Sequence, residues 1–369
     1  MKLAVFPGDG IGPEIVGVSL DVIDSLVRQF SLALDFAVHP AGLAALAKYC
    51  STFPEQSRQA AGEADGIILG PLDTASYPKE IDGGVNASAK LRNDLDLYAN
   101  IRPARSLPGV PCAIASMDLV IVRENTEGFY AGRAMHAGSG EFAPDANTAY
   151  SLRRISAHCS RRIAERAFEI ARTRCRRVAA VHKANVLPLT DGIFLRECRA
   201  VSRQYRDVNY EELLVDAAAA KLVAGCHDMD VLVTTNLFGD ILSNEAAALA
   251  GGLGLAASLN HGDKHAMAQA SHGAAPDIAG RGIANPASIL LSIALLFEHL
   301  SRTRSFPSLE QAGCSLRRAV EQTVIDPHTR TPDLGGSTTT KRFAQSVIQA
   351  LPSSRVEQSE YLLRMSVGS

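Results

Sequence analysis

The sequence predicts an α/β protein, and two observations support that fold class. Short runs rich in Val, Ile and Leu alternate with stretches whose apolar residues recur every three or four positions. This alternation is typical of a sheet packed between helices. With 369 residues, of which 46% are hydrophobic and 21% charged, the chain is long enough for two subdomains.

The predicted strands are short and spread along the first two thirds of the chain. They cover residues 3–6, 66–69, 119–122, 178–181 and 231–235. Residues 155–172 carry apolar side chains at helical spacing, including Ile155, Cys159 and Ile163. Residues 135–150 are rich in Gly, Ala and Pro without helical periodicity, which suits either a protruding arm or an ordinary surface loop.

A glycine turn follows the first predicted strand. Residues 8–14 read Gly-Asp-Gly-Ile-Gly-Pro-Glu, and Pro13 suits the first turn of a helix. The spacing differs from both the G-x-G-x-x-G dinucleotide fingerprint and the phosphate-binding P-loop. We therefore expect a tight turn at a helix N-terminus, with room for a ligand beside it.

Two segments carry side chains suited to acid–base chemistry. Arg123 precedes Tyr130 by seven residues, and Lys183 follows the strand predicted at 178–181. In α/β proteins such strand ends are where sites usually lie. A guanidinium that grips a carboxylate, a phenol that donates a proton and an amine that accepts one suit chemistry on a carboxylic acid.

Arg92 and Arg102 lie ten residues apart around an apolar stretch expected to be a strand. Together with Arg123, they could anchor a di- or tricarboxylate through bidentate pairs. Three surface ion pairs are the alternative interpretation of the same residues.

Asp216, Asp240 and Asn244 are candidate ligands for a divalent cation. Asp240 and Asn244 are four positions apart, so on a helix beginning near Gly239 they share one face. Oxygen ligands with open positions for water suit Mg²⁺ or Mn²⁺. A helix cap is the alternative role for Asp240.

A long segment from His272 to Pro286 contains many small and turn-forming residues. Loops of this length without secondary structure are usually functional. The carboxylate of Asp277 could accept hydrogen bonds from a ribose diol and repel a 2′-phosphate.

Composition argues against several other classes of protein. The net charge is −2, which speaks against a nucleic-acid or membrane surface, and no apolar run is long enough to span a bilayer. The seven cysteines are scattered without C-x-x-C spacing. We therefore expect reduced thiols and a cytoplasmic location.

Taken together, these motifs resemble the isocitrate/isopropylmalate dehydrogenase family of β-decarboxylating dehydrogenases. The resemblance runs from Gly8 to Gly336, and the string Thr-Asn-Leu-Phe-Gly-Asp-Ile-Leu-Ser at residues 235–243 is its most specific part together with the His272 segment. It implies a two-lobe α/β fold that is not a Rossmann fold. The large, cofactor-binding lobe would comprise residues 1–98 and 251–369. The small lobe would comprise residues 99–250, with the dimer interface and an arm near 135–150.

The resemblance also implies the roles of individual residues. Tyr130 would protonate the enolate left by decarboxylation, and Lys183 would assist removal of the hydroxyl proton. The implied substrate contacts are Arg92, Arg102, Arg123, Asn86, Ser88 and Asn185. The implied metal ligands are Asp216, Asp240 and Asn244. The implied NAD contacts are Ile11, His272, Gly273, Ala274, Ala275, Pro276, Asp277, Ile278 and Asn285. In the family, the lysine and the first aspartate reach into the partner's site, so a homodimer with shared active sites is implied.

Two departures from the family pattern bear on function. Asn244 stands where a third aspartate is usual, which predicts weaker Mg²⁺ or Mn²⁺ binding. The stretch from Val85 to Lys90 matches neither the leucines of isopropylmalate enzymes nor the Ser/Asn pattern of isocitrate enzymes. The expected reaction is NAD-dependent oxidative decarboxylation of a 3-substituted malate. A tartrate- or malate-type dehydrogenase and a catalytically silent regulatory subunit are the alternatives.

Overall fold

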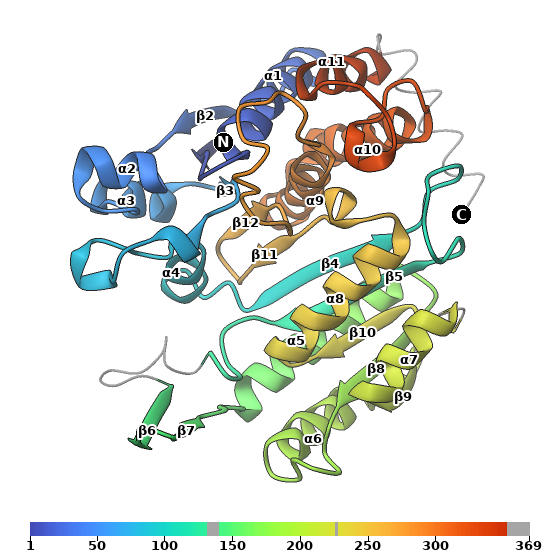
Figure 1. Ribbon diagram of the computed structural model, residues 1–369. Coiled ribbons are helices and arrows are strands. Elements are labelled where there is room, and N and C mark those ends of the chain that lie inside the picture. Colours follow the sequence, from blue (N-terminus) through green and yellow to red (C-terminus); the bar gives the residue numbers. More distant parts are fainter. Residues whose placement is uncertain (131–139, 226–227, 353–369) are drawn as a thin grey trace.

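The computed structural model describes residues 1–130, 140–225 and 228–352, and these form a mixed α/β fold (Figure 1). Ten strands build one sheet in the order β2-β1-β3-β12-β11-β4-β5-β10-β8-β9. The strands of this sheet are β1 (Lys2–Phe6), β2 (Asp35–Val38), β3 (Gly66–Leu69), β4 (Ala99–Arg105), β5 (Asp118–Glu124), β8 (Arg177–His182), β9 (Asn209–Leu214), β10 (Val231–Thr234), β11 (Leu259–His261) and β12 (Ala266–Gln269). All five predicted strands are present, and the prediction for 66–69 has the observed bounds.

The order of the strands divides the sheet in two. We call β2-β1-β3-β12-β11 sheet half I and β4-β5-β10-β8-β9 sheet half II. Half I is built from segments near both ends of the chain, and half II from the middle. The halves meet where β11 pairs with β4 in antiparallel fashion, and β4 pairs with β5 in the same way.

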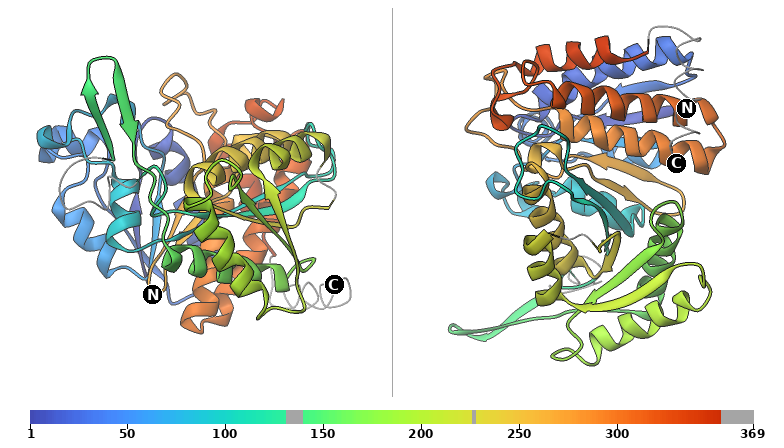
Figure 2. Two further views of the ribbon diagram at one scale, coloured as in Figure 1. Left: turned by 90° about the horizontal axis from the view of Figure 1, so that it is seen from below. Right: turned by 90° about the vertical axis from the view of Figure 1, so that its right-hand side faces the viewer.

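Helices cover both faces of the sheet (Figures 1 and 2). The α-helices are α1 (Gly12–Phe30), α2 (Leu43–Tyr49), α3 (Glu55–Glu63), α4 (Ala87–Asp94), α5 (Ala157–Arg172), α6 (Thr190–Ser202), α7 (Val215–Gly225), α8 (Asn236–Ala250), α9 (Ala287–Arg304), α10 (Pro307–Ile325) and α11 (Thr340–Ala350). Short 3₁₀ turns are η1 (Thr74–Ser76), η2 (Glu80–Asp82), η4 (Leu253–Leu255) and η5 (Pro332–Leu334).

One continuous apolar core lies on a single face of the sheet. It joins α1, α9, α10 and α11 over half I to α5 and α6 over half II. On the opposite face, α2, α3 and α4 cover half I, whereas α7 and α8 cover half II. Successive strand residues point to opposite faces, and so Val120 joins the continuous core whereas Leu119 and Ile121 face α8. By the same alternation, Arg102 and Arg123 lie on the α8 face.

A separate two-stranded hairpin, β6 (Glu141–Asp145) with β7 (Thr148–Ser151), stands away from the main sheet. Both strands are exposed along their whole length, and the rings of Phe142 and Tyr150 stack at 5.1 Å between centroids. The expected arm therefore includes this hairpin, whereas residues 135–139 of the expectation lie outside the described residues.

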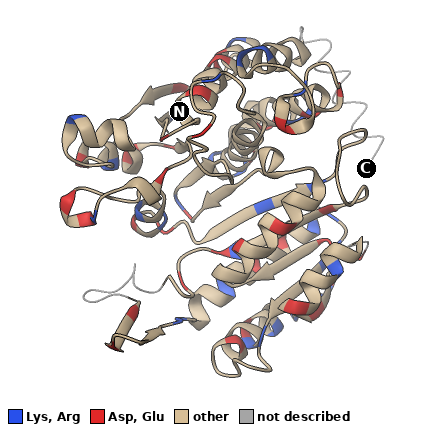
Figure 3. Cartoon of the chain, in the orientation of Figure 1, with Lys and Arg blue, Asp and Glu red and all other residues tan. Residues whose placement is uncertain are grey.

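The surface carries charges of both signs. In Figure 3, acidic and basic residues are interspersed over both sheet halves, so neither sign dominates the visible face. No helix within the described ranges combines the length and the apolar character needed to cross a membrane.

Candidate active site

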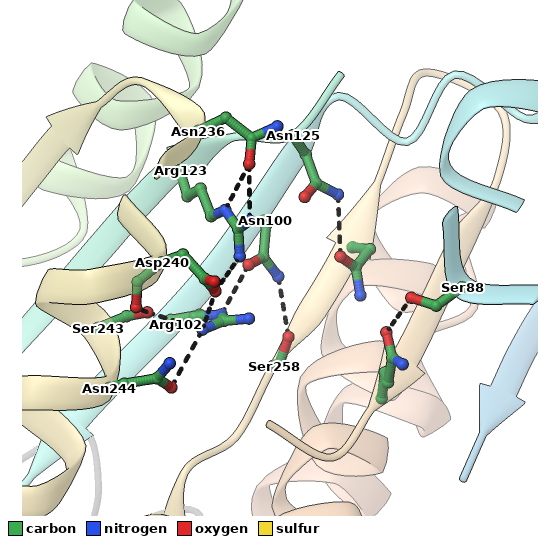
Figure 4. Close-up of polar contacts among 12 residues, drawn as sticks. Ser88, Asn100, Arg102, Arg123, Asn125, Asn236, Asp240, Ser243, Asn244 and Ser258 are labelled. Atoms are coloured by element: carbon green, nitrogen blue, oxygen red, sulfur yellow. Dashed lines mark hydrogen bonds and ion pairs between the residues drawn. The ribbon is translucent and has the colours of Figure 1, made fainter. Parts of the chain in front are cut away.

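Two buried arginines converge on one carboxylate on the α8 face of half II (Figure 4). Arg123, in β5, donates from Nη1 to Asp240 Oδ1, and Arg102 Nη1 of the adjacent strand β4 lies 3.2 Å from the same oxygen. The side chains of Arg123 and Arg102 are only 3% and 9% exposed. The antiparallel pairing of β4 with β5 brings these two sequence-predicted residues together.

Neutral side chains accept further hydrogen bonds from both guanidinium groups. Asn236 Oδ1 accepts from both Nε and Nη2 of Arg123, at 3.0 and 2.6 Å. Arg102 donates from Nε to Asn100 Oδ1 at 2.7 Å and from Nη1 to Ser243 Oγ at 2.7 Å. Sequence reasoning missed these three partners as individual residues, although Asn236 and Ser243 belong to the specific string at 235–243. Amides and hydroxyls orient a guanidinium without neutralising it.

The cluster is therefore short of negative charge. Two guanidinium groups share one carboxylate, and burial together with the nearby Arg123 lowers the pKa of Arg102 to about 10. Tyr130 lies beside this pair, with its ring centroid 6.0 Å from Arg123 Cζ. A buried surplus of positive charge next to a phenol suits an anionic substrate and a proton transfer.

Helix α8 begins at Asn236 after the N-cap Thr235, not near Gly239, and the suggestion that Asp240 caps the helix is wrong. Asp240 sits in the second turn, and Asn244 follows one turn later on the same face, as predicted. Asn244 Oδ1 lies 3.5 Å from Arg102 Nη1, so its carbonyl oxygen faces the arginine pair.

Arg92 lies in helix α4, so the expectation that it flanks a strand is wrong. Arg102 lies within strand β4. Gln269, at the end of β12, joins α4 to half I, because its Oε1 accepts from Arg92 Nη2 at 3.2 Å and from Ser88 Oγ at 2.9 Å. Asn86 caps α4 and accepts from the Ala89 amide at 3.0 Å. Gln269 is a further residue that sequence reasoning missed, because only its distant partners reveal its role.

Lys183 and Asp216 form a second charged group. Lys183 Nζ donates to Asp216 Oδ1 at 2.7 Å, and this contact lowers the pKa of Asp216. The aspartate side chain is 64% exposed. Asn185, two residues beyond the lysine, is also exposed.

The backbone at Lys183 is fixed by a hydrogen bond to a buried carboxylate. Its amide donates to Asp191 Oδ2 at 2.5 Å, and Asp191 is fully buried and pairs with Arg153. Arg153 also donates to Thr235 Oγ1 at 3.0 Å, at the start of α8. Asp191 and Arg153 were not predicted, and their role depends on contacts made across three separate elements.

No described hydrogen bond or ion pair joins the Lys183–Asp216 pair to the Arg102–Arg123–Asp240 cluster. Within residues 1–130, 140–225 and 228–352, no three His, Cys, Asp or Glu side chains gather closely enough to hold a metal ion. Of the three predicted metal ligands, Asp240 and Asn244 share one face of α8, whereas Asp216 pairs with Lys183.

The predicted glycine turn contacts the predicted cofactor loop directly. The Ile11 amide donates to Ala274 O at 2.9 Å. Gly10 has a φ of +56°, and a Cβ there would lie 2.0 Å from that same carbonyl oxygen. Only glycine allows this approach, which explains the residue in physical terms.

The cofactor loop runs from the end of β12 to α9 without helix or strand, as expected. His272 Nδ1 contacts Gly273 O at 3.0 Å, whereas its Nε2 is buried without a hydrogen-bond partner among the described residues. Asn285 Nδ2 donates to Asp333 Oδ2 at 2.9 Å. Asp277 is exposed at the surface of the loop.

Glu14, in the first turn of α1, anchors the far end of the loop. Its carboxylate accepts from the amides of Gly282 at 3.2 Å and Ala284 at 3.1 Å, and from Thr340 Oγ1. The glycine turn, its helix and the loop thus form one unit beside half I, with Pro276, Ala275 and Ile278 on the span between the anchors.

Known proteins are similar to this chain in both sequence and fold. The family model for isocitrate/isopropylmalate dehydrogenase matches residues 2–348. A 3-isopropylmalate dehydrogenase of Methanothermobacter thermautotrophicus is 40% identical over 352 residues, covering 95% of this chain and 98% of its own. An isocitrate/homoisocitrate dehydrogenase of Thermus thermophilus is 39% identical over 353 residues, covering 95% and 99%.

Among solved structures, isocitrate dehydrogenase from Methylococcus capsulatus superposes with a TM-score of 0.83 at 36% identity, covering 95% of this chain and 98% of that one. The match along nearly the whole chain confirms the resemblance drawn from the motifs. This protein belongs to the isocitrate/isopropylmalate dehydrogenase family.

Proposed function

We propose that this protein catalyses the NAD-dependent and divalent-metal-dependent oxidative decarboxylation of a 3-substituted malate, of the isopropylmalate, isocitrate or homoisocitrate type. The observation that carries the proposal is the pair of buried arginines that shares the single carboxylate of Asp240 beside Tyr130. A dicarboxylate or tricarboxylate would supply the negative charge that this cluster lacks.

Arg102, Arg123 and Arg92 would bind the substrate carboxylates and fix the orientation of the reacting carbons. Ser88, Asn86 and Asn185 are the proposed contacts to the rest of the substrate. The Gln269 contact fixes where Arg92 and Ser88 stand, because both donate to the same amide oxygen.

Tyr130 and Lys183 would handle the protons. Lys183 would accept the proton of the 2-hydroxyl as the hydride leaves, and Tyr130 would return a proton to the carbon from which CO₂ departs. Tyr130 stands beside two guanidinium groups, which would stabilise the phenolate left after that transfer.

Asp240 and Asn244 of one chain and Asp216 of a second chain would hold Mg²⁺ or Mn²⁺. Carboxylate and amide oxygens are suitable ligands for these cations. When bound, the cation would polarise the carbonyl oxygen of the oxidised substrate. We propose a homodimer with shared sites because Lys183 and Asp216 pair with each other near the surface, whereas Asp240 pairs with Arg102 and Arg123.

The NAD site would include Ile11, His272, Asn285 and residues 273–278. The buried Nε2 of His272 has no hydrogen-bond partner among the described residues, and a bound dinucleotide could supply one. Asp277 would accept from the ribose diol and repel a 2′-phosphate, and no ion pair with Arg281 is present to offset this charge among the described residues.

The two sheet halves support the proposed division into lobes, with 1–98 and 251–369 in the large lobe and 99–250 in the small one. Every strand of half I falls in the first set, and every strand of half II in the second. The arginine cluster would then lie on the small-lobe side of the junction at β4 and β11.

The proposal is tested by following NADH formation with isocitrate, homoisocitrate, 3-isopropylmalate, tartrate and malate in the presence of Mg²⁺ or Mn²⁺. We expect turnover and stoichiometric CO₂ release with a 3-substituted malate, and lower catalytic efficiency with NADP. Turnover of tartrate or malate alone would replace the proposed substrate class. A folded protein inactive on every acid would support the silent regulatory subunit instead.

A further inference from the structure

A cavity lies on the face of the sheet opposite the arginine cluster. Its volume is about 550 Å³, within the range of sites that hold small organic molecules. Ile101 and Pro103 line it, and they flank Arg102 along β4, so strand alternation places them on the other face. The cavity is therefore separated from the proposed active site by the sheet itself.

Both sheet halves contribute walls to this cavity. Helix α5 supplies Ile170 and Arg166 from half II, whereas α9 and α10 supply Leu295 and Arg317 from the side of half I. Figure 2 shows α5 and the α9–α10 pair on the same face of the sheet, on either side of the junction. A molecule bound here would contact both halves of the sheet.

The floor of the cavity is apolar. It is formed by Ile101, Pro103, Leu255, Leu259, Leu291 and Leu295. The rings of His261 and His299 lie 4.5 Å apart at the wall, and burial lowers both pKa values, that of His299 to about 4. Both imidazoles are thus neutral near pH 7, and they add flat surface without charge.

The rim carries charges of both signs, because the carboxylates of Asp118, Glu169 and Glu321 line it beside arginines that outnumber them. Five arginines line the cavity: Arg105, Arg166, Arg174, Arg302 and Arg317. Four of them form ion pairs, whereas Arg302 makes no hydrogen bond or ion pair with the described residues. In addition, Arg166 Nε is buried without a hydrogen-bond partner in this part of the chain. One acidic group in the cavity could form a charge-assisted hydrogen bond with Arg302, which is exposed at the rim.

We propose that this cavity binds a small, flat aromatic anion with a single acidic group. The ring system would lie on the apolar floor against the two histidines, and the acidic group would face Arg302. Binding here is independent of the proposed reaction, because no residue of the arginine cluster or of the Lys183–Asp216 pair lines the cavity.

The fluorescent aryl sulfonate 8-anilinonaphthalene-1-sulfonate serves as the probe. The chain contains no tryptophan, so Thr173→Trp on the cavity rim and Tyr49→Trp on the distant helix α2 each introduce a single energy donor. We expect saturable energy transfer to the probe that is strong for Thr173→Trp and weak for Tyr49→Trp. Equal transfer in both variants, or none in either, would overturn the proposal.

A matched pair of substitutions tests the charged end of the cavity. Arg302 and Arg304 are both exposed near the end of α9, but only Arg302 lines the cavity. We expect Arg302→Gln to weaken probe binding by about three- to tenfold, as the loss of one charged contact predicts, and Arg304→Gln to leave it unchanged. Leu295→Phe, which narrows the floor, should also weaken binding.

Thermal melting of each variant confirms that it is folded before binding is compared. An affinity that is unaffected by both Arg302→Gln and Leu295→Phe would exclude the cavity as the binding site. So would displacement of the probe by excess NADH, because it would place the probe in the proposed cofactor site. A protein inactive on every acid would leave these fluorescence results unaffected, so failure of the proposed function is distinguishable from failure of this inference.

Discussion

The two groups of charged residues in this protein differ in how the fold supports them. The first, Arg102, Arg123 and Asp240, is held on buried strands, and amides and hydroxyls occupy the other guanidinium nitrogens. The second, Lys183 and Asp216, is a single ion pair near the surface. Both groups contain residues that the sequence motifs indicated for the same reaction.

The difference indicates what each group requires. Buried guanidinium groups need hydrogen-bond partners, and the single chain supplies them to all three nitrogens of Arg123 and to Nε and Nη1 of Arg102. An exposed ion pair contributes little to stability and is easily exchanged for other partners. An exposed pair of this kind is compatible with the proposed action of Lys183 and Asp216 on a second copy of the chain, whereas the arginine cluster is held by contacts within its own chain.

The largest expected effect is on catalysis and involves Lys183 of the second group and Tyr130, which lies beside the first. Lys183→Ala should suppress hydride transfer, and Tyr130→Phe should slow enolate protonation, each lowering turnover by about 10²–10⁴-fold. Steady-state rates on the best substrate measure the total loss, and a pre-steady-state burst of NADH with Tyr130→Phe would separate the two steps. Near wild-type turnover in both variants would show that neither residue transfers a proton.

Mixing inactive subunits tests whether the two groups act across a dimer. If Lys183 works in the partner's site, a dimer of Lys183→Ala with Asp240→Asn retains one site with both residues intact. After joint refolding we expect about a quarter of wild-type activity, since half the dimers are mixed and each has one working site. Lys183→Ala mixed with Asp216→Asn is the control. It should recover nothing, because both changes lie in the same surface group.

The free energy of unfolding should depend on the first group of charged residues and not on the second. Arg123→Met leaves Asn236 Oδ1 without its two donors and removes one of the cations on Asp240, so we expect a loss of about 2–4 kcal/mol, reduced by the partial exposure of Asp240. Lys183→Met should leave the urea midpoint unchanged. Urea unfolding at one fixed protein concentration measures both. Equal destabilisation by the two changes would show that the surface pair is a structural element.

The smallest effect concerns the metal. Asn244→Asp adds a charge beside Asp240, and we expect about a tenfold lower Mn²⁺ concentration at half-maximal activity, since one decade corresponds to about 1.4 kcal/mol. The competing outcome follows from the contact of Asn244 Oδ1 with Arg102. If the new carboxylate pairs with Arg102 instead, half-saturation stays unchanged while the KM for substrate rises, and Asn244 is then no metal ligand.

Local patterns in the sequence were sufficient for the α/β class, the five strands, the glycine turn and the shared helix face of Asp240 and Asn244. These features depend on neighbouring residues, because side-chain periodicity and glycine geometry act over a few positions. The long loop at His272 was likewise evident from its composition. The motifs were also specific enough to indicate the family, which the comparisons confirm.

The tertiary structure was needed wherever partners lie far apart in the chain. Asn236 and Arg123 are 113 residues apart, Ser243 and Arg102 are 141 apart, and Gln269 meets Ser88 across 181 residues. No local pattern marks such pairs, since they arise from strand pairing and from the side of the sheet that each helix covers. The same long-range packing pairs Lys183 with Asp216 and Arg123 with Asp240, and it leaves a cavity behind β4 whose walls come from both halves of the sheet.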